Sequence, residues 1–232
     1  MKAKISFLAL GCLAFAFMLA SPSLAGTWRD DFEDGNLDGW EVFNPIPAEK
    51  WGVEDGECSG EWQNADPGMF SVLYLMVENA DSWKDYTVKF KMKFVATGHF
   101  TGMSFRENLG RSYGFVIDTA KNTAWAWKFF QGVNTFPSEI PLPFTLSKDT
   151  WYELKIIVEG DNFEFYIDGK PAGEFEDNSI PSGKVGLYVR NAHAHFDDVV
   201  ITGPEIPDGG SWKTVEPKGK LATSWGKLKT GY

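Results

Sequence analysis

The chain has 232 residues, a formal net charge of −10 and an aromatic content of 16%, with ten tryptophans. The negative charge is concentrated in residues 26–210, which carry −16, because residues 1–25 hold two lysines and residues 211–232 hold five lysines against one glutamate. A body this acidic repels nucleic acid and anionic membrane surfaces, and it is better suited to neutral sugars or cations.

Residues 1–25 have the pattern of a secretory signal peptide. A lysine-containing start precedes an apolar run that is short for a membrane span, and small residues at the offsets of a cleavage site end at Ala25. We therefore expect residues 26–232 to act outside the cytoplasm, in the extracellular space, the periplasm or the cell envelope, without membrane insertion after cleavage. Only Cys58 remains in that part of the chain, so it forms no intramolecular disulfide.

From Gly26 onward, short alternating runs separated by Gly, Pro, Asn and Asp predict β-strands, and no long stretch has helical period. The run YTVKFKMKF at 86–94 alternates apolar residues with lysines, so one face is expected to pack on a core. The segment NFEFYIDGKPAGEF at 162–175 is expected to form a hairpin with its turn at DGK. In chain order, the predicted strands lie in GTWRDDF, KWGVED, SVLYLMVE, YTVKFKMKFVA, FTGMSFRE, YGFVIDTA, TAWAWKFF, TWYELKIIVEG, NFEFYIDGK, PAGEFED, GKVGLYV and HAHFDDVVITG. The pattern predicts an all-β protein, a two-sheet antiparallel jelly-roll sandwich.

The composition changes after Gly203. Residues 204–232 are rich in Pro, Gly and Lys, and we expect a linker followed by a loosely ordered tail. This tail is basic while the body is acidic, so it either contacts an acidic surface or remains a solvated terminus. The expected organisation is a signal peptide at 1–25, a jelly-roll domain at 26–203 and a tail at 204–232.

Six segments occur in an order that resembles a known family. In chain order they are DDFEDGNLDGWEVF, WGVEDGECSG, SWKDYTVKFKMKF, TGMSFRENLGRSYGFVID, TWYELKIIVEGDNFEFYIDGK and SGKVGLYVRNAHAHFDDVVITG. The set resembles concanavalin A-like lectin and glucanase domains over about residues 28–203. It is most similar to the branch that contains the 3-keto-disaccharide hydrolase domain and laminin-G-like sandwiches. The resemblance implies a convex and a concave sheet, carbohydrate bound on the concave side, and a last strand that lies near the first.

The stretch NAHAHFDDVV at 191–200 suits more than one interpretation. On a strand, His193, His195 and Asp197 share a face, and a transition metal accepts such a set of ligands. Alternatively, the resemblance implies a calcium ion that joins the two ends of the domain, because family-sixteen glucanases carry one there and calcium prefers carboxylate and carbonyl oxygens. The expected calcium ligands are Asp31, Glu33, Gly56 and Asp198. A third interpretation is that the two acids only cap turns.

Two patterns bear on catalysis. Glu159 and Glu164 formally match the Glu-x-Asp-x-x-Glu motif of family-sixteen glucanases. The residues between them are a turn signal, which places the acids on opposite sides of a hairpin and argues against a retaining glucanase of that kind. The resemblance to 3-keto-disaccharide hydrolases instead implies an arginine followed by acids, although HFTG stands where that family often has NSG. The candidate catalytic residues are Arg106, Glu107 and Asp118, with a plain salt bridge as the alternative.

Aromatic and polar residues on neighbouring predicted strands suit a sugar. Trp125 and Trp127 share one face of their strand, and flat rings cover the apolar faces of pyranoses. The candidate ligand-binding residues are Arg106, Tyr113, Trp125, Trp127, Tyr188, Arg190 and Asn191. The alternative is that both tryptophans belong to the core. The sequence thus predicts a secreted glycan-binding module. A glycoside hydrolase acting on a di- or polysaccharide is the first alternative, and a structural or adhesion module of the cell envelope is the second.

Overall fold

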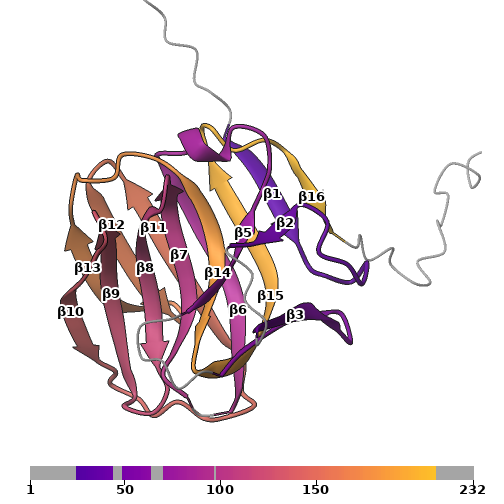
Figure 1. The fold of residues 1–232 in the computed structure, drawn as a ribbon, viewed down its shortest axis with the longest axis vertical. Coiled ribbons are helices and arrows are strands. Elements are labelled where there is room, and N and C mark those ends of the chain that lie inside the picture. The colour runs from indigo at the N-terminus through magenta and orange to yellow at the C-terminus, as the bar shows by residue number, and fades with distance from the viewer. Residues whose placement is uncertain (1–24, 44–48, 64–69, 97, 213–232) are drawn as a thin grey trace, which may run out of the picture.

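Two β-sheets lie face to face in the computed structural model, which describes residues 25–43, 49–63, 70–96 and 98–212 (Figure 1). The pairing is antiparallel throughout these residues, except that β1 and β16 run parallel. This architecture confirms the predicted all-β jelly-roll sandwich. Within the same residues, no helix is long and apolar enough to cross a membrane. The predicted signal peptide lies outside the described residues except for Ala25, as does the tail from residue 213 onward.

Sheet A has nine strands and sheet B has seven. The strands of sheet A are β1 (Gly26–Asp30), β3 (Glu49–Glu54), β4 (Glu57–Trp62), β6 (Tyr86–Ala96), β11 (Tyr152–Glu159), β12 (Asn162–Ile167), β13 (Lys170–Glu176), β15 (Ala192–Gly203) and β16 (Gly209–Ser211). The strands of sheet B are β2 (Trp40–Val42), β5 (Ser71–Leu75), β7 (Phe100–Asn108), β8 (Arg111–Asp118), β9 (Thr123–Phe130), β10 (Val133–Pro141) and β14 (Lys184–Arg190). One turn of 3₁₀ helix, η1 (Ala80–Ser82), follows β5. The order in sheet B is β10-β9-β8-β7-β14-β5-β2.

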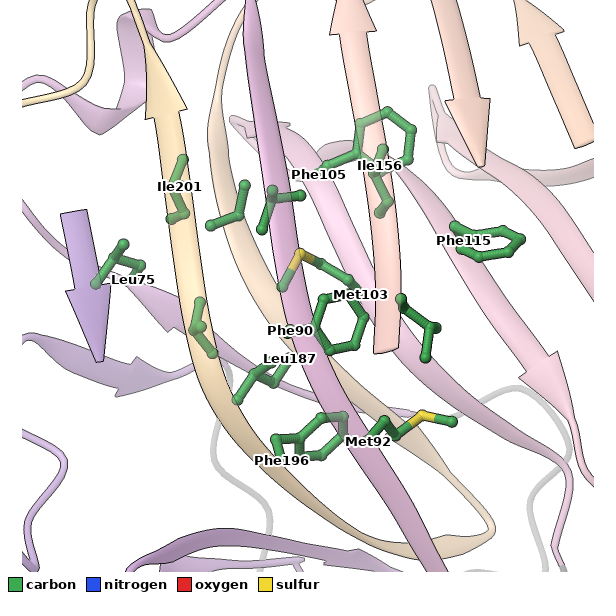
Figure 2. Close-up of a cluster of buried hydrophobic side chains, with 14 of the residues drawn as sticks. Leu75, Phe90, Met92, Met103, Phe105, Phe115, Ile156, Leu187, Phe196 and Ile201 are labelled. Carbon is green, nitrogen blue, oxygen red and sulfur yellow. The ribbon is translucent and has the colours of Figure 1, made fainter. Parts of the chain in front are cut away.

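The apolar core fills the space between the two sheets (Figure 2). On β6 the predicted alternation holds, because Phe90 and Met92 are buried while the intervening Lys91 points away from the core. Rings from the two sheets meet directly, as where Phe115 of β8 stacks on Phe165 of β12 with ring centroids 4.4 Å apart and planes 7° apart. Burial of this kind is the main favourable contribution to the stability of such a fold.

The last long strand, β15, organises sheet A. It pairs with β6 along one side, and on its other side it pairs first with β4 and then with β1. The change of partner coincides with a β-bulge at Asp197 and Asp198, where Asp198 has a φ of 48°. The last strand therefore lies beside the first, as expected, although they come from opposite ends of the domain (Figure 1).

The predicted hairpin at DGK is confirmed, because β12 and β13 pair around Asp168 and Gly169. These two residues have φ angles of 49° and 71°. Positive φ at both central positions is the two-residue turn whose twist matches that of the flanking strands. The local sequence was sufficient here because Asp-Gly is a residue pair that adopts this turn readily.

Four short or irregular strands, β2, β4, β10 and β16, were not predicted. β10 contains Pro137 and is accommodated as an edge strand with a register shift between Thr135 and Ser138. Proline lacks the N–H that a central strand needs, so an edge and a bulge are where it is tolerated. β4 contains Gly60, whose missing side chain leaves room for the Trp51 ring of β3. The edge position of β10 and the space beside Gly60 both depend on an adjacent strand. The sequence of the strand itself therefore gives no signal for them.

The described fold also extends past the predicted domain end at Gly203. Ile206 is buried, and β16 pairs with β1 as a parallel edge strand. Residues 204–212 therefore belong to the folded domain and not to a loose linker. Their Pro- and Gly-rich composition reflects a tight return of the chain, in which the carbonyl of Ile206 lies where a side chain on Gly26 would be.

Candidate functional site

The outer face of sheet B carries a second apolar cluster, separate from the core. Alternation along β8 sends Phe115 to the core and Val116 outward, and Trp127 of β9 and Tyr188 of β14 also point outward. Their rings lie 5.6 Å apart between centroids. Two of the predicted sugar-binding aromatics are thus brought together on one face, away from the core.

This aromatic pair is covered. Phe70, which precedes β5, stacks on Tyr188 at 5.3 Å and 26°, and it also contacts Trp127 at 6.2 Å. Trp127 and Tyr188 are each only 4% exposed, and the cavity left beside them is about 10 Å³. Ligand pockets are typically some hundreds of cubic ångströms, so a sugar ring does not fit in this state. Trp125 lies further along the same face and is half-buried, with Lys121 over its ring.

An open pocket of about 500 Å³ lies at another part of the same outer face. We call it the sheet-B pocket, and its lining residues are Glu41, Val42, Phe43, Tyr74, Met76, Asp81, Glu107, Asn108, Leu109, Gly110 and Lys184. These lie on or directly beside β2, β5, β14, η1 and the end of β7 with its turn to β8; β5, β14 and β7 lie next to one another in Figure 1. Its apolar side chains are unusually exposed for large hydrophobic residues: 46% for Phe43, 46% for Met76 and 88% for Leu109.

Tyr74 and Glu107 are the buried members of the pocket lining. The Tyr74 hydroxyl lies 3.3 Å from Ser104 Oγ, and its ring meets that of Phe43 edge to face at 5.7 Å. Glu107 is 6% exposed and accepts a 2.9 Å hydrogen bond from the backbone N–H of Gly110. Burial raises the pKa of Glu107, and the hydrogen bond from Gly110 only partly offsets this. A buried carboxylate with a raised pKa at the wall of an open pocket is a candidate functional group.

Arg106, the neighbour of Glu107 in sequence, points the opposite way. A register shift in β7 gives Arg106 a φ of 50° and turns its side chain into the protein, where it is 1% exposed. Its guanidinium donates hydrogen bonds to the carbonyls of Ile180 (3.2 Å), Lys84 (2.9 Å) and Gly160 (2.6 Å). Arg106 therefore ties three separate segments together and forms no salt bridge with Glu107.

The third candidate catalytic residue, Asp118, lies at the opposite end of the sheet-B strands. It caps the β8–β9 turn by accepting hydrogen bonds from the backbone N–H groups of Ala120 and Lys121, both at 3.1 Å. Asp118 pairs with Phe100, and Glu107 is seven residues further along β7, or about 20 Å at the rise of a strand. Paired glycosidase carboxylates are about 5 to 10 Å apart, so these two acids do not form such a pair.

The remaining candidate binding residues are divided between several places. Tyr113 faces the core, where its hydroxyl donates to Asp177 Oδ1 at 2.6 Å and accepts from the Ile180 N–H at 3.0 Å. Arg190 lies on the outer face beside the covered aromatic pair. Asn191 lies in the turn between β14 and β15, and its carbonyl accepts from the His99 N–H.

The histidines of NAHAHFDDVV lie on the outer face of sheet A. His195 Nδ1 lies 2.6 Å from Glu57 Oε2, and Lys93 Nζ lies 2.8 Å from the same oxygen. Partial burial opposes ionisation of Glu57, but the hydrogen bonds from Lys93 and His195 outweigh it and lower the pKa of this carboxyl. His193 Nε2 lies 3.2 Å from Ser59 Oγ. Among the described residues, no group of three or more His, Cys, Asp or Glu is arranged to hold a metal ion.

The predicted calcium ligands are only partly assembled. The Glu33 carboxylate lies against Gly56, within 3.1 Å of where a Cβ on that glycine would be. Asp198, in contrast, forms a 2.5 Å ion pair with Lys91 of β6. The Lys91 ammonium therefore neutralises one of the four carboxylate and carbonyl ligands that the sequence predicted. The calcium site stays a prediction of the sequence.

The sheet-B pocket was not found from the sequence because its residues come from five segments. On β5 every residue is buried, so SVLYL shows no alternation that would single out Tyr74 as facing outward. Glu107 was identified, but as a partner of Arg106. The bulge that turns Arg106 inward and Glu107 outward has no clear signal in FREN.

The fold and the pocket define a class of protein: a jelly roll of the kind shared by carbohydrate-binding modules and glycosidases. Comparison with protein-family models then identifies the family. The chain belongs to the 3-keto-alpha-glucoside-1,2-lyase-like domain family, whose model matches residues 27–202. This confirms the resemblance to the 3-keto-disaccharide hydrolase branch.

Individual relatives are distant. Over 169 residues the chain is 24% identical to a levanase from Bacillus subtilis strain 168; the match covers 71% of this chain but only 23% of the levanase. A carbohydrate-binding module from Bacillus subtilis has a similar structure, with a TM-score of 0.61, 20% identity, and coverage of 73% of this chain and 98% of that one. A Bacillus licheniformis β-glucanase gives a TM-score of 0.59 at 12% identity, covering 77% and 98%. At these identities the structural matches establish the fold.

Proposed function

We propose that this protein is an extracytoplasmic carbohydrate-binding module whose glycan binds in the sheet-B pocket. One observation carries the proposal: an open pocket of about 500 Å³ combines an exposed ring, Phe43, and an aromatic floor, Tyr74, with the charged groups of Glu107 and Lys184. Sugars are bound by aromatic rings against their apolar faces and by a few fixed polar groups at their hydroxyls. The family and the relatives named above support a glycan as the ligand class.

Another hollow in the described residues is larger but less suited to a sugar. It has a volume of about 620 Å³ and lies along β12 and β13, lined mainly by glutamates. Its two aromatic residues offer little open surface, because Phe163 is buried and Phe175 packs partly into the core. We therefore place the glycan in the sheet-B pocket.

Hydrolysis is the second candidate function, and Glu107 is the observation that favours it. Burial raises the pKa of this carboxyl, which is the condition under which a carboxylic acid acts as a general acid near neutral pH. Glu41 and Asp81 line the same pocket and are the acids available as its partner. Arg106, which the sequence suggested as a catalytic residue, is committed to backbone carbonyls inside the protein.

The test is binding of an oligosaccharide panel to residues 26–232 by titration calorimetry, with mass spectrometry of the same mixtures. We expect at least one oligosaccharide to bind without new masses, and Phe43→Ala to weaken it about tenfold, the effect of losing one ring contact. Trp125→Ala is the matched control, since it removes a partly exposed ring on the same face outside the pocket, and it should leave affinity unchanged.

The other outcomes separate the alternatives. New masses that vanish in Glu107→Gln would make the protein a hydrolase. Loss of binding in Trp125→Ala but not in Phe43→Ala would move the site to the other aromatic residues of the face. No binding and no product across a broad panel would refute a glycan function and favour an adhesion role for the domain.

A further inference from the structure

We propose that the sheet-B pocket selects a glycan with a free, protonated amino group, and that the ammonium pairs with Glu107. This inference rests on the proposed function, because it specifies the ligand of the same pocket. It follows from three features of the described residues: the charge of the lining, the ion pairing of Lys184, and the lack of a cation at Glu107.

The lining of the pocket is acidic. It contains three carboxylates, from Glu41, Asp81 and Glu107, and one ammonium, from Lys184. The body of the chain has the same sign, with a net charge of −16 over residues 26–210. A cationic ligand is therefore attracted at long range and also inside the pocket, whereas a uronic acid is repelled.

The lysine of the pocket does not neutralise Glu107. Lys184 lies directly across from Glu107 in the β7–β14 register, but its ammonium pairs with Asp81 Oδ1 at 3.3 Å and touches the Met76 sulfur at 3.7 Å. Among the residues that the structure describes, no lysine or arginine forms an ion pair with Glu107. Within the described parts of the chain, Glu107 accepts a hydrogen bond from the Gly110 N–H.

Burial without a neighbouring cation destabilises the ionised form of a carboxyl group. A ligand that brings a cation to the carboxylate compensates for this destabilisation. Charge-assisted hydrogen bonds are about twice as strong as neutral ones, so an ammonium gains more at Glu107 than a hydroxyl does. Tyr74 and Phe43 line the same pocket and provide rings for the apolar face of the sugar. The pocket thus matches an amino sugar in both its apolar and its charged part.

The affinity for the amine should depend on pH. It should fall in acid as Glu107 becomes protonated, and in alkali as the ligand amine loses its proton. The other charged groups that act on Glu107 are Lys184 from β14, Asp81 from η1 and Arg111 from β8. Lys184 and Arg111 favour the ionised carboxyl, Asp81 opposes it, and burial outweighs them, so the loss in acid should start above the ordinary range for a glutamate.

The experiment compares two oligosaccharides that differ only in acetylation: a β-1,4-linked glucosamine tetrasaccharide and its N-acetylated counterpart. Binding to residues 26–232 is measured by calorimetry at neutral pH and fixed salt. We expect the amine to bind about tenfold more tightly than the acetamide. Glu107→Gln keeps the acceptor for the Gly110 N–H and should remove the difference.

Two further variants serve as controls. Glu164→Gln removes the same charge from an exposed site on β12, and it should leave the preference intact. Lys184→Gln removes the ammonium that lines the pocket and pairs with Asp81. It should increase the preference for the amine, so it tests the inference even if Glu107→Gln proves unstable.

The outcomes distinguish this inference from the proposed function. Equal binding of both tetrasaccharides would overturn the amine preference and leave a glycan site in place. A preference that changes by the same small amount in Glu107→Gln and in Glu164→Gln would mean attraction by the acidic body alone, and it would also overturn the inference. If neither these tetrasaccharides nor any member of the wider panel binds, the proposed function fails as well.

Discussion

Replacing Arg106 by methionine tests whether this residue is structural or catalytic. The structure assigns it three hydrogen bonds from a buried guanidinium to the carbonyls of Lys84, Gly160 and Ile180. A hydrogen bond that involves a charged group contributes about 1.5 to 3 kcal/mol to stability. Methionine loses all three bonds, but it also removes the desolvation cost of a buried charge, which offsets part of the loss. We therefore expect Arg106→Met to lower the free energy of unfolding by about 3 to 5 kcal/mol, and the Tm by about 10 °C.

The measurement is urea denaturation followed by tryptophan fluorescence and by circular dichroism, which should give coincident transitions. Arg111→Met is the matched control, because Arg111 is half-buried and, among the described residues, donates one 3.3 Å hydrogen bond, to the Asn108 carbonyl. This variant should lose less than about 1 kcal/mol. A loss of under about 1 kcal/mol in Arg106→Met, with loss of glycan binding instead, would refute the structural role and restore Arg106 to the ligand site.

Two other predictions concern charged groups away from the pocket. Burial opposes ionisation of Asp177, but hydrogen bonds, the first of them from Lys128 and another from Tyr113, outweigh it and hold its pKa well below the ordinary value. Because the unfolded state then binds more protons in acid, this contribution is present above about pH 4 and is lost as the pH falls. Asp177→Asn should flatten the decline in stability between about pH 5 and 2, and an unchanged acid limb in denaturant titrations would count against it. For calcium, Lys91 already pairs with Asp198, so we expect chelator and added calcium to leave the Tm unchanged; a calcium-dependent rise would support the four-ligand site predicted from the sequence.

The pocket itself was the hardest part to predict, and the reason is visible on β7. FREN contains the buried arginine and the pocket carboxylate as adjacent residues, and alternation alone would place them on opposite faces without saying which face is the core. The register shift after Phe105 decides this, and it arises from pairing with β8 and β14. The same applies to Trp127, for which alternation left both the core and the outer face open. The structure places it on the outer face, where Phe70 covers it from a distant part of the chain.

What the sequence by itself determined are the features that depend on near neighbours in the chain. The alternation in YTVKFKMKF defined the buried face of β6, and Asp168-Gly169 defined a hairpin, because side-chain period and turn conformation are local properties. Only the tertiary structure decided that β15 changes partner at Asp198, that Arg106 binds three distant carbonyls, and that Glu107 shares a pocket with Tyr74. These depend on strand order and register, which are set by burial over the whole chain and not by any one segment.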